Sequence, residues 1–104
     1  MYIIIPAYEP DKRLIQVVQD ITIKLPKARI IVVNDGSGPR YNDYYDETAL
    51  FGATVLKHPI NKGKGAALKT AFAYIQEEVV RQHLSAQPIV TVDSDGQHLI
   101  KDIV

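Results

Sequence analysis

Residues 30–37 have the sequence Ile-Ile-Val-Val-Asn-Asp-Gly-Ser, an apolar run that ends in a polar turn. The run is short, and most of its residues are β-branched. A strand that is apolar on both faces is typical of a parallel sheet covered on both sides. The segment therefore predicts a buried strand whose carboxyl end carries Asn34, Asp35, Gly36 and Ser37.

Short apolar runs and helical patterns alternate along the rest of the chain. Strands are predicted at residues 3–5, 30–33, 54–56 and 89–92. Apolar residues at helical spacing predict helices around residues 14–21 and 68–79, and a weaker one at 41–50. The last strong helix is expected to bury Leu68, Ala71, Phe72, Ile75 and Val79. With right-handed crossovers, this order predicts a doubly wound, mainly parallel α/β sheet with helices on both faces.

Polar segments follow all four predicted strands. They are residues 6–9, 34–37, 58–61 and 93–95. Because the carboxyl ends of parallel strands share one edge, where such sheets bind their ligands, we expect these segments to form a single site.

The amino-acid composition of the chain excludes several classes of function. Twelve basic residues balance twelve acidic ones, which provides no basic field for nucleic acid. The absence of cysteine excludes disulfides and thiolate metal sites. The apolar runs are too short to cross a bilayer, and no targeting segment is recognisable. We therefore expect a cytoplasmic chain.

The last residues indicate truncation. Residues 99–104 have the pattern of a beginning helix, so we expect residues 1–104 to be the N-terminal part of a longer domain, cut after the fourth strand. The fourth strand would then have an open edge, and we expect self-association through it.

Asp93-Ser94-Asp95 is the strongest candidate for a metal site. Two carboxylates at a strand end can converge on Mg2+ or Mn2+ and so neutralise a diphosphate. Capping of a following helix explains the same residues. An aspartyl phosphohydrolase, with Asp93 as nucleophile and Asp95 as acid and base, is a second alternative. A calcium loop is excluded, because His98 and Val104 occupy the positions that require glycine and glutamate.

Residues 61–67, Asn-Lys-Gly-Lys-Gly-Ala-Ala, open the strongest predicted helix, and they favour phosphate binding through free amides and two lysines. The alternative is a flexible loop before a closely packed helix. A Walker loop is excluded, because Leu68 rather than glycine precedes Lys69-Thr70. Asp35 fits either a nucleotide contact or a simple turn, and Tyr8 either a base-stacking ring or an ordinary surface tyrosine.

Together the motifs Ile-Pro-Ala-Tyr-Glu (5–9), Val-Val-Asn-Asp-Gly-Ser (32–37), Asn-x-Gly-x-x-x-Ala (61–67) and Asp-Ser-Asp (93–95) resemble family 2 of the inverting glycosyltransferases. That family has the GT-A, nucleotide-diphospho-sugar transferase-like fold. Residues 61–67 and Asp-Ser-Asp-Gly-Gln-His (93–98) are similar to the polyprenyl (dolichyl) phosphate mannose or glucose synthase branch. One departure from the family pattern is Asn34, which stands where many members have an aspartate.

The resemblance implies a role for particular residues. The implied donor-nucleotide contacts are Pro6, Tyr8, Glu9, Asp35, Lys64 and Asp93. The implied metal ligands, for Mg2+ or Mn2+, are Asp93, Asp95 and Gln97.

The resemblance also implies the reaction, which is transfer of a sugar with inversion from a UDP- or GDP-sugar to an acceptor. In the polyprenyl-phosphate branch the acceptor is a polyprenyl phosphate, and the parent protein works at the cytoplasmic face of the membrane. The acceptor site and any catalytic base are expected beyond residue 104, so no catalytic residue is assigned. The chain alone is expected to bind donor weakly and to turn over poorly or not at all. A non-catalytic nucleotide-binding module is the alternative.

Overall fold

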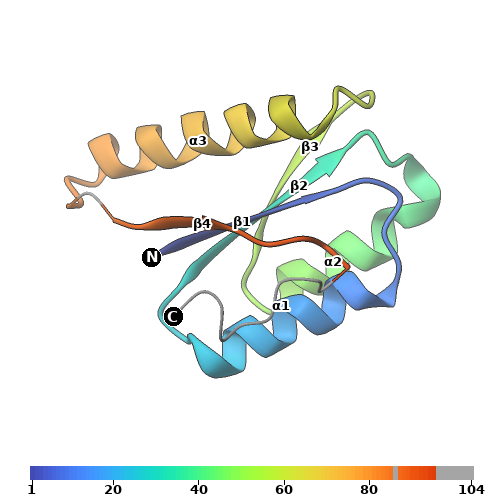
Figure 1. The fold of residues 1–104 in the computed structure, drawn as a ribbon, viewed down its shortest axis with the longest axis horizontal. Coiled ribbons are helices and arrows are strands. Elements are labelled where there is room, and N and C mark those ends of the chain that lie inside the picture. Colours follow the sequence, from blue (N-terminus) through green and yellow to red (C-terminus); the bar gives the residue numbers. More distant parts are fainter. Residues whose placement is uncertain (86, 96–104) are drawn as a thin grey trace.

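The computed structural model describes residues 1–85 and 87–95, which form a four-stranded sheet with helices on both faces (Figure 1). All the strands and helices predicted between residues 3 and 92 are present. In chain order the elements are β1 (Tyr2–Ala7), α1 (Lys12–Lys24), β2 (Arg29–Asp35), the short 3-10 helix η1 (Pro39–Tyr41), α2 (Asn42–Leu50), β3 (Thr54–His58), α3 (Lys64–Arg81) and β4 (Ile89–Thr91).

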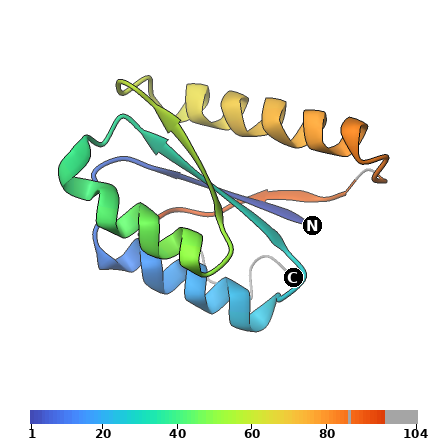
Figure 2. The same ribbon diagram turned by 180° about the vertical axis from the view of Figure 1, so that it is seen from behind.

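The strands lie in the order β3-β2-β1-β4, and each neighbouring pair is parallel. Helices α1 and α2 cover one face of the sheet and α3 covers the other, as the view from behind in Figure 2 also shows. The strand order therefore reverses beside β1, which confirms the predicted doubly wound arrangement. Parallel pairing brings the carboxyl ends of all the strands to one edge of the sheet.

Each central strand contributes to two cores, because successive side chains point to opposite faces of a sheet. The core beneath α1 and α2 includes Ile3, Ile5, Leu14, Val18, Ile21, Ile30, Val32 and Val92. The core beneath α3 includes Tyr2, Ile4, Ile31, Val33, Ala67, Ala71 and Ile75. This double burial explains why residues 3–5 of β1 and 30–33 of β2 are continuously apolar.

Helix α3 is rotated relative to the prediction. Phe72, expected in the core, is 44% exposed, and the buried positions are Ala67, Ala71, Ile75 and Glu78. Small alanines let the first half of the helix lie close to the sheet. Glu78 is buried at the other end because it accepts hydrogen bonds from the Tyr2 hydroxyl at 2.8 Å and from the Arg29 guanidinium at 2.6 Å.

Strand β4 is less buried than its apolar sequence predicts. It pairs with β1, but Ile89 is 41% exposed and Thr91 is also exposed, whereas Val92 just after it is buried. The predicted helix at residues 99–104 lies outside the described residues. Among the described residues, none of the helices combines the length and apolar character needed to cross a bilayer.

Candidate functional site

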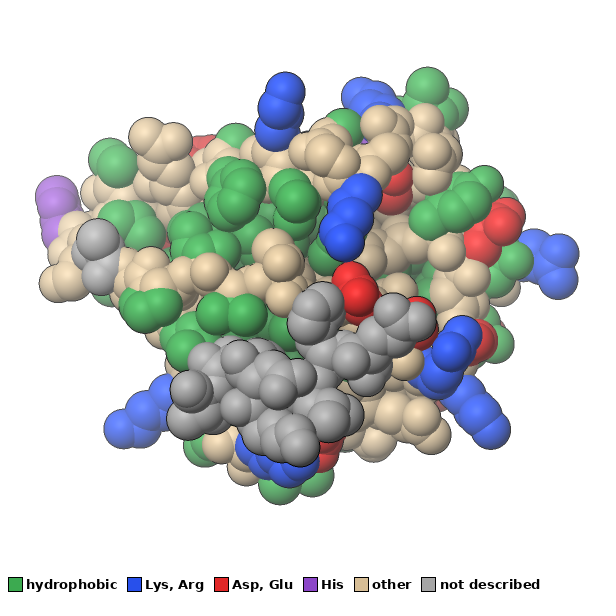
Figure 3. Space-filling model, in the orientation of Figure 1, with side chains coloured by type: hydrophobic (Ala, Val, Ile, Leu, Met, Phe, Trp, Pro, Cys, Tyr) green, Lys and Arg blue, Asp and Glu red, His purple; other side chains and the backbone are tan. Residues whose placement is uncertain are grey.

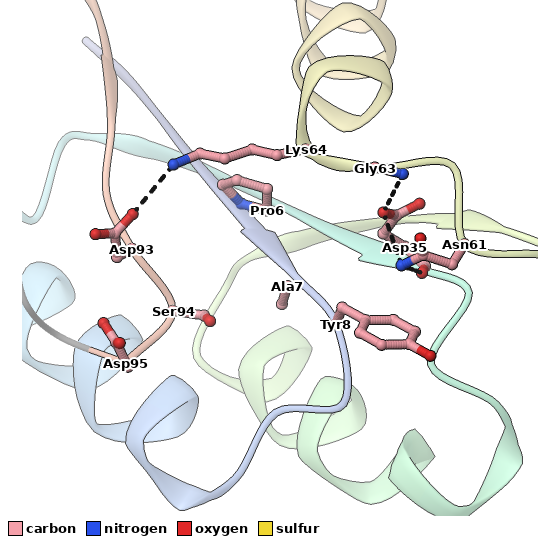
Figure 4. Close-up of a pocket in the computed structure, with 10 residues that line it drawn as sticks. All are labelled: Pro6, Ala7, Tyr8, Asp35, Asn61, Gly63, Lys64, Asp93, Ser94 and Asp95. Atoms are coloured by element: carbon pink, nitrogen blue, oxygen red, sulfur yellow. Dashed lines mark hydrogen bonds and ion pairs between the residues drawn. The ribbon is translucent and has the colours of Figure 1, made fainter.

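A pocket of about 280 Å³ lies at the carboxyl edge of the sheet (Figure 4). It receives residues from the end of β1, the end of β2, the loop before α3 and the segment after β4. Its lining consists of Pro6, Ala7, Tyr8, Asp35, Asn61, Gly63, Lys64, Asp93, Ser94 and Asp95. The expected convergence of the polar strand-end segments is therefore observed.

Asp93 and Asp95 lie at one end of this pocket, and the aromatic ring of Tyr8 lies at the other end, on the side of Asp35. In Figure 4, Asp93 and Asp95 are on one side, Tyr8 and Asn61 are on the other, and Lys64 extends from the start of α3 toward Asp93. The Lys64 ammonium is 3.4 Å from a carboxylate oxygen of Asp93. The pocket thus offers an acidic end bordered by a lysine and an aromatic end.

Asp35 is the most highly bonded group of the site. Its Oδ1 accepts hydrogen bonds from His58 Nδ1 at 2.8 Å and from the Lys62 amide at 2.9 Å. Its Oδ2 accepts from the Gly63 amide at 2.9 Å and from the Asn61 side chain at 3.2 Å. A carboxylate has about four acceptor sites. These donors occupy them, so Asp35 is committed to holding the loop before α3.

The electrostatic state of Asp35 follows from these bonds. Burial alone would raise its pKa, but the hydrogen bonds from His58 and from the amides of Lys62 and Gly63 stabilise the charged form more strongly. The pKa of Asp35 is therefore lowered, and the residue is a carboxylate at neutral pH.

Gly36 allows the turn after β2 to contact the loop before α3. Its φ is +73°, and a Cβ at this position would lie 2.2 Å from the Asn61 nitrogen and from the Ile60 carbonyl carbon. No side chain fits there. The glycine of the Asp-Gly-Ser motif is thus required by backbone packing.

Ser37 holds the loop that carries Tyr8. The Tyr45 hydroxyl donates to the Ala7 carbonyl at 3.2 Å, so the Ser37 hydroxyl donates to the Tyr45 oxygen at 2.7 Å. The Ser37 oxygen in turn accepts from the Glu9 amide at 2.9 Å. Burial raises the pKa of Tyr45 to about 12. These hydrogen bonds fix the backbone that follows β1, where Glu9 has a φ of 47°.

The structure brings together six of the residues singled out from the sequence, namely Pro6, Tyr8, Asp35, Lys64, Asp93 and Asp95. Glu9 is not among the lining residues, and its role stays a prediction. Gln97 and His98 lie outside the described residues. Asn61 belongs to the predicted loop, but its side-chain contact with Asp35 could not be predicted, because the two residues are 26 positions apart in sequence.

The chemistry of the donor set suits Mg2+ or Mn2+. Such ions are commonly held by one or two carboxylates, with waters and substrate phosphates completing the shell. Asp93 and Asp95 supply that number on one side of the pocket. Within the described ranges, no group of three or more acidic, histidine or cysteine side chains is placed to hold a metal by itself.

Comparison with known proteins places the chain in a family. The sequence profile of glycosyl transferase family 2 matches residues 2–103. The chain belongs to this family. This membership confirms the resemblance inferred from the motifs, and it decides against the phosphohydrolase alternative for Asp93 and Asp95.

Two similar proteins are named as transferases of a sugar to dolichyl phosphate. This family 2 chain is 31% identical over 115 residues to a dolichyl-phosphate beta-glucosyltransferase of Trichomonas vaginalis, covering 95% of this chain and 31% of the relative. It is 31% identical over 117 residues to a UDP-N-acetylglucosamine–dolichyl-phosphate N-acetylglucosaminyltransferase of Methanococcus voltae, covering 99% of this chain and 44% of the relative. The chain thus spans less than half the length of these curated relatives.

A solved structure has the same fold. It is the mannosyltransferase PcManGT from Pyrobaculum calidifontis in complex with GDP-Man and Mn2+, with a TM-score of 0.63 at 22% identity. The match covers 90% of this chain and 27% of that one. The likeness confirms the predicted GT-A fold.

Proposed function

We propose that residues 1–104 form the donor-binding half of a metal-dependent inverting glycosyltransferase that uses a UDP- or GDP-sugar. The observation that carries the proposal is the pairing, in one pocket, of an acidic end bordered by Lys64 with an aromatic end at Tyr8. A nucleoside diphosphate has the complementary halves, a planar base and a charged diphosphate. Family membership and the names of the relatives support the same reaction class.

The proposed binding mode follows the polarity of the pocket. Tyr8 would stack on the base beside Pro6, because aromatic faces accept any planar base. Lys64 would contact the diphosphate, and Asp93 the ribose and the metal. Asp95 would be the main ligand of Mg2+ or Mn2+, with Gln97 as a further ligand. The ion would neutralise charge on the diphosphate leaving group.

Asp35 receives a different role in this proposal. A base or ribose contact from its carboxylate would have to displace one of the four donors that it already binds. We therefore propose that Asp35 acts on the donor indirectly, by holding residues 61–63.

The proposed acceptor is a polyprenyl phosphate, in line with the dolichyl-phosphate acceptors in the names of the relatives. Such a phosphate is already an anion near neutral pH, so its oxygen can attack the sugar without a general base. None of the described residues is assigned as catalytic. We place the reaction in the cytoplasm, at the cytoplasmic face of a membrane.

Titration of the chain with UDP and with GDP, each with Mn2+, tests the proposal by calorimetry and amide chemical shifts. We expect binding that requires the metal. Asp95→Ala should weaken it at least about tenfold, because even the loss of a residue that only supports a metal ligand costs about 10- to 100-fold. A folded sample that binds neither nucleotide would refute the proposal. So would binding that is equal in the Asp95→Ala variant. If the affinity for the metal is the same with and without nucleotide, the result would favour a non-catalytic nucleotide-binding module.

A further inference from the structure

His58, the last residue of β3, links two other elements through its imidazole. Nδ1 is 2.8 Å from Asp35 Oδ1 at the end of β2, and Nε2 is 2.7 Å from Thr70 Oγ1 in α3. The His58 side chain is only 7% exposed. It lies behind the pocket rather than in its lining.

The direction of these bonds follows from the charge of Asp35. Because Asp35 is a carboxylate, it can only accept, and His58 Nδ1 must carry the hydrogen. In a neutral imidazole the other nitrogen is then an acceptor, so the Thr70 hydroxyl donates to Nε2. With a neutral imidazole, the hydrogen bonds run in one direction, from Thr70 through His58 to Asp35.

This relay, the hydrogen bonds from Thr70 through His58 to Asp35, is connected to the backbone of the loop that precedes α3. The oxygen of Asp35 that binds His58 also binds the Lys62 amide, and its second oxygen binds the Gly63 amide. The orientation of one carboxylate thus sets both amides, and Lys64 follows directly as the first residue of α3. Thr70, further along the same helix, fixes the other end of the relay.

We infer that His58 is a positioning residue of the donor pocket, which orients Asp35 so that residues 61–63 hold Lys64 toward Asp93 and a bound diphosphate. The inference rests on the proposed function for its effect on donor binding. Its effect on the loop is independent of that function. A histidine that only filled space in the core would have neither effect beyond a general loss of stability.

Two substitutions of His58 separate these roles. The amide nitrogen of asparagine lies close to the position of Nδ1, so His58→Asn keeps a donor to Asp35. The amide nitrogen of glutamine lies close to Nε2, so His58→Gln keeps a group near Thr70 and loses the donor to Asp35. His83→Gln, at an exposed histidine just after α3, is the matched control.

The first measurement is amide hydrogen exchange, which needs no ligand. In His58→Gln we expect Lys62 and Gly63 to lose at least about tenfold in protection, while Ile4 in β1 changes little. His58→Asn and His83→Gln should stay within about threefold of the wild type. Equal protection of Lys62 and Gly63 in the Gln and Asn variants would overturn the inference.

The second measurement is the Kd of UDP and of GDP with Mn2+. We expect His58→Gln to raise it about tenfold and His58→Asn to restore most of the affinity. If the wild type binds neither nucleotide, the proposed function fails, and the exchange experiment still decides whether His58 positions the loop. If His58→Gln does not fold, Thr70→Val replaces it, with Thr70→Ser as the conservative variant. Unchanged protection of Lys62 and Gly63 in Thr70→Val would then overturn the relay.

Discussion

The ammonium of Lys64 lies 3.4 Å from the carboxylate of Asp93, and this ion pair joins the first turn of α3 to the segment after β4. The side chains are 64% and 30% exposed, so water screens the pair and its contribution is at most about 1 kcal/mol. In the proposed donor complex, a metal and a diphosphate would replace this ion pair. If Asp93 binds a metal as proposed, Lys64 would compete with that metal in the absence of nucleotide.

Removal of the Lys64 charge is expected to change two affinities in opposite directions. Lys64→Met should strengthen binding of Mn2+ alone, by up to about fivefold, because the competing cation is lost. It should weaken binding of UDP with Mn2+, by about tenfold, because the contact between the lysine ammonium and the diphosphate is lost. Calorimetry of both titrations measures this. Lys69→Met removes the same charge from an exposed position of α3 and should change neither. Shifts in the same direction in Lys64→Met would contradict the competition.

Gly36→Ala is expected to destabilise the fold by at least about 2 kcal/mol. The new Cβ would overlap the backbone of Ile60 and Asn61, in addition to the cost of a left-handed backbone. Gly52→Ala separates the two effects, because Gly52 also has a positive φ but has open space around it. It should cost only about 1 kcal/mol. Urea denaturation of both variants gives the comparison, and equal losses would show that the close approach is unimportant.

Because the pKa of Tyr45 is raised, we expect the folded chain to lose stability at high pH. Its pKa is about 12 in the folded chain and 10.0 when unperturbed, so above pH 10 the unfolded state releases a proton that the folded state retains. The stabilisation is complete below pH 10 and is lost as pH rises toward 12, with a magnitude on the order of 1 to 3 kcal/mol.

Tyr45→Phe tests this pH dependence. The variant should be less stable at neutral pH by about 1 to 2 kcal/mol, because Ser37 loses an acceptor and the Ala7 carbonyl loses a donor. It should also lose less stability between pH 9 and 12 than the wild type does. Urea denaturation at a series of pH values checks both. Parallel pH curves for the two proteins would be the contrary result.

We expect copies of the chain to associate through strand β4 in a concentration-dependent way. Among the described residues β4 pairs with β1 alone, and Ile89 is exposed on it. Figure 3 shows hydrophobic side chains gathered on the face that carries this strand. Unpaired strand edges with apolar side chains tend to pair with other chains.

Ile89→Lys should reduce this association, because a charged side chain on an edge strand opposes pairing. Ile23→Lys, at an exposed position of α1, should leave it unchanged. Light scattering over a range of concentrations measures both variants. A wild-type chain that stays strictly monomeric would refute the prediction.

The sequence alone was sufficient to predict the doubly wound sheet, because continuous apolar runs and helical periodicity are local patterns. It also predicted that the residues after the strands would meet, since parallel strands bring their carboxyl ends to one edge. Pro6, Tyr8, Lys64, Asp93 and Asp95 are accordingly found together in the pocket.

Only the tertiary structure decided what Asp35, His58 and Tyr45 do. From the sequence, Asp35 taken alone fitted a turn better than a ligand contact, and its partners at residues 61–63 are 26 to 28 positions away. For His58 the sequence indicated only its place in the polar segment 58–61, and Tyr45 carried no signal, because a polar side chain becomes a positioning group only through the partners that folding brings to it. The rotation of α3 that exposes Phe72 has the same origin, since the face of a helix that packs closely depends on the shape of the sheet beneath it.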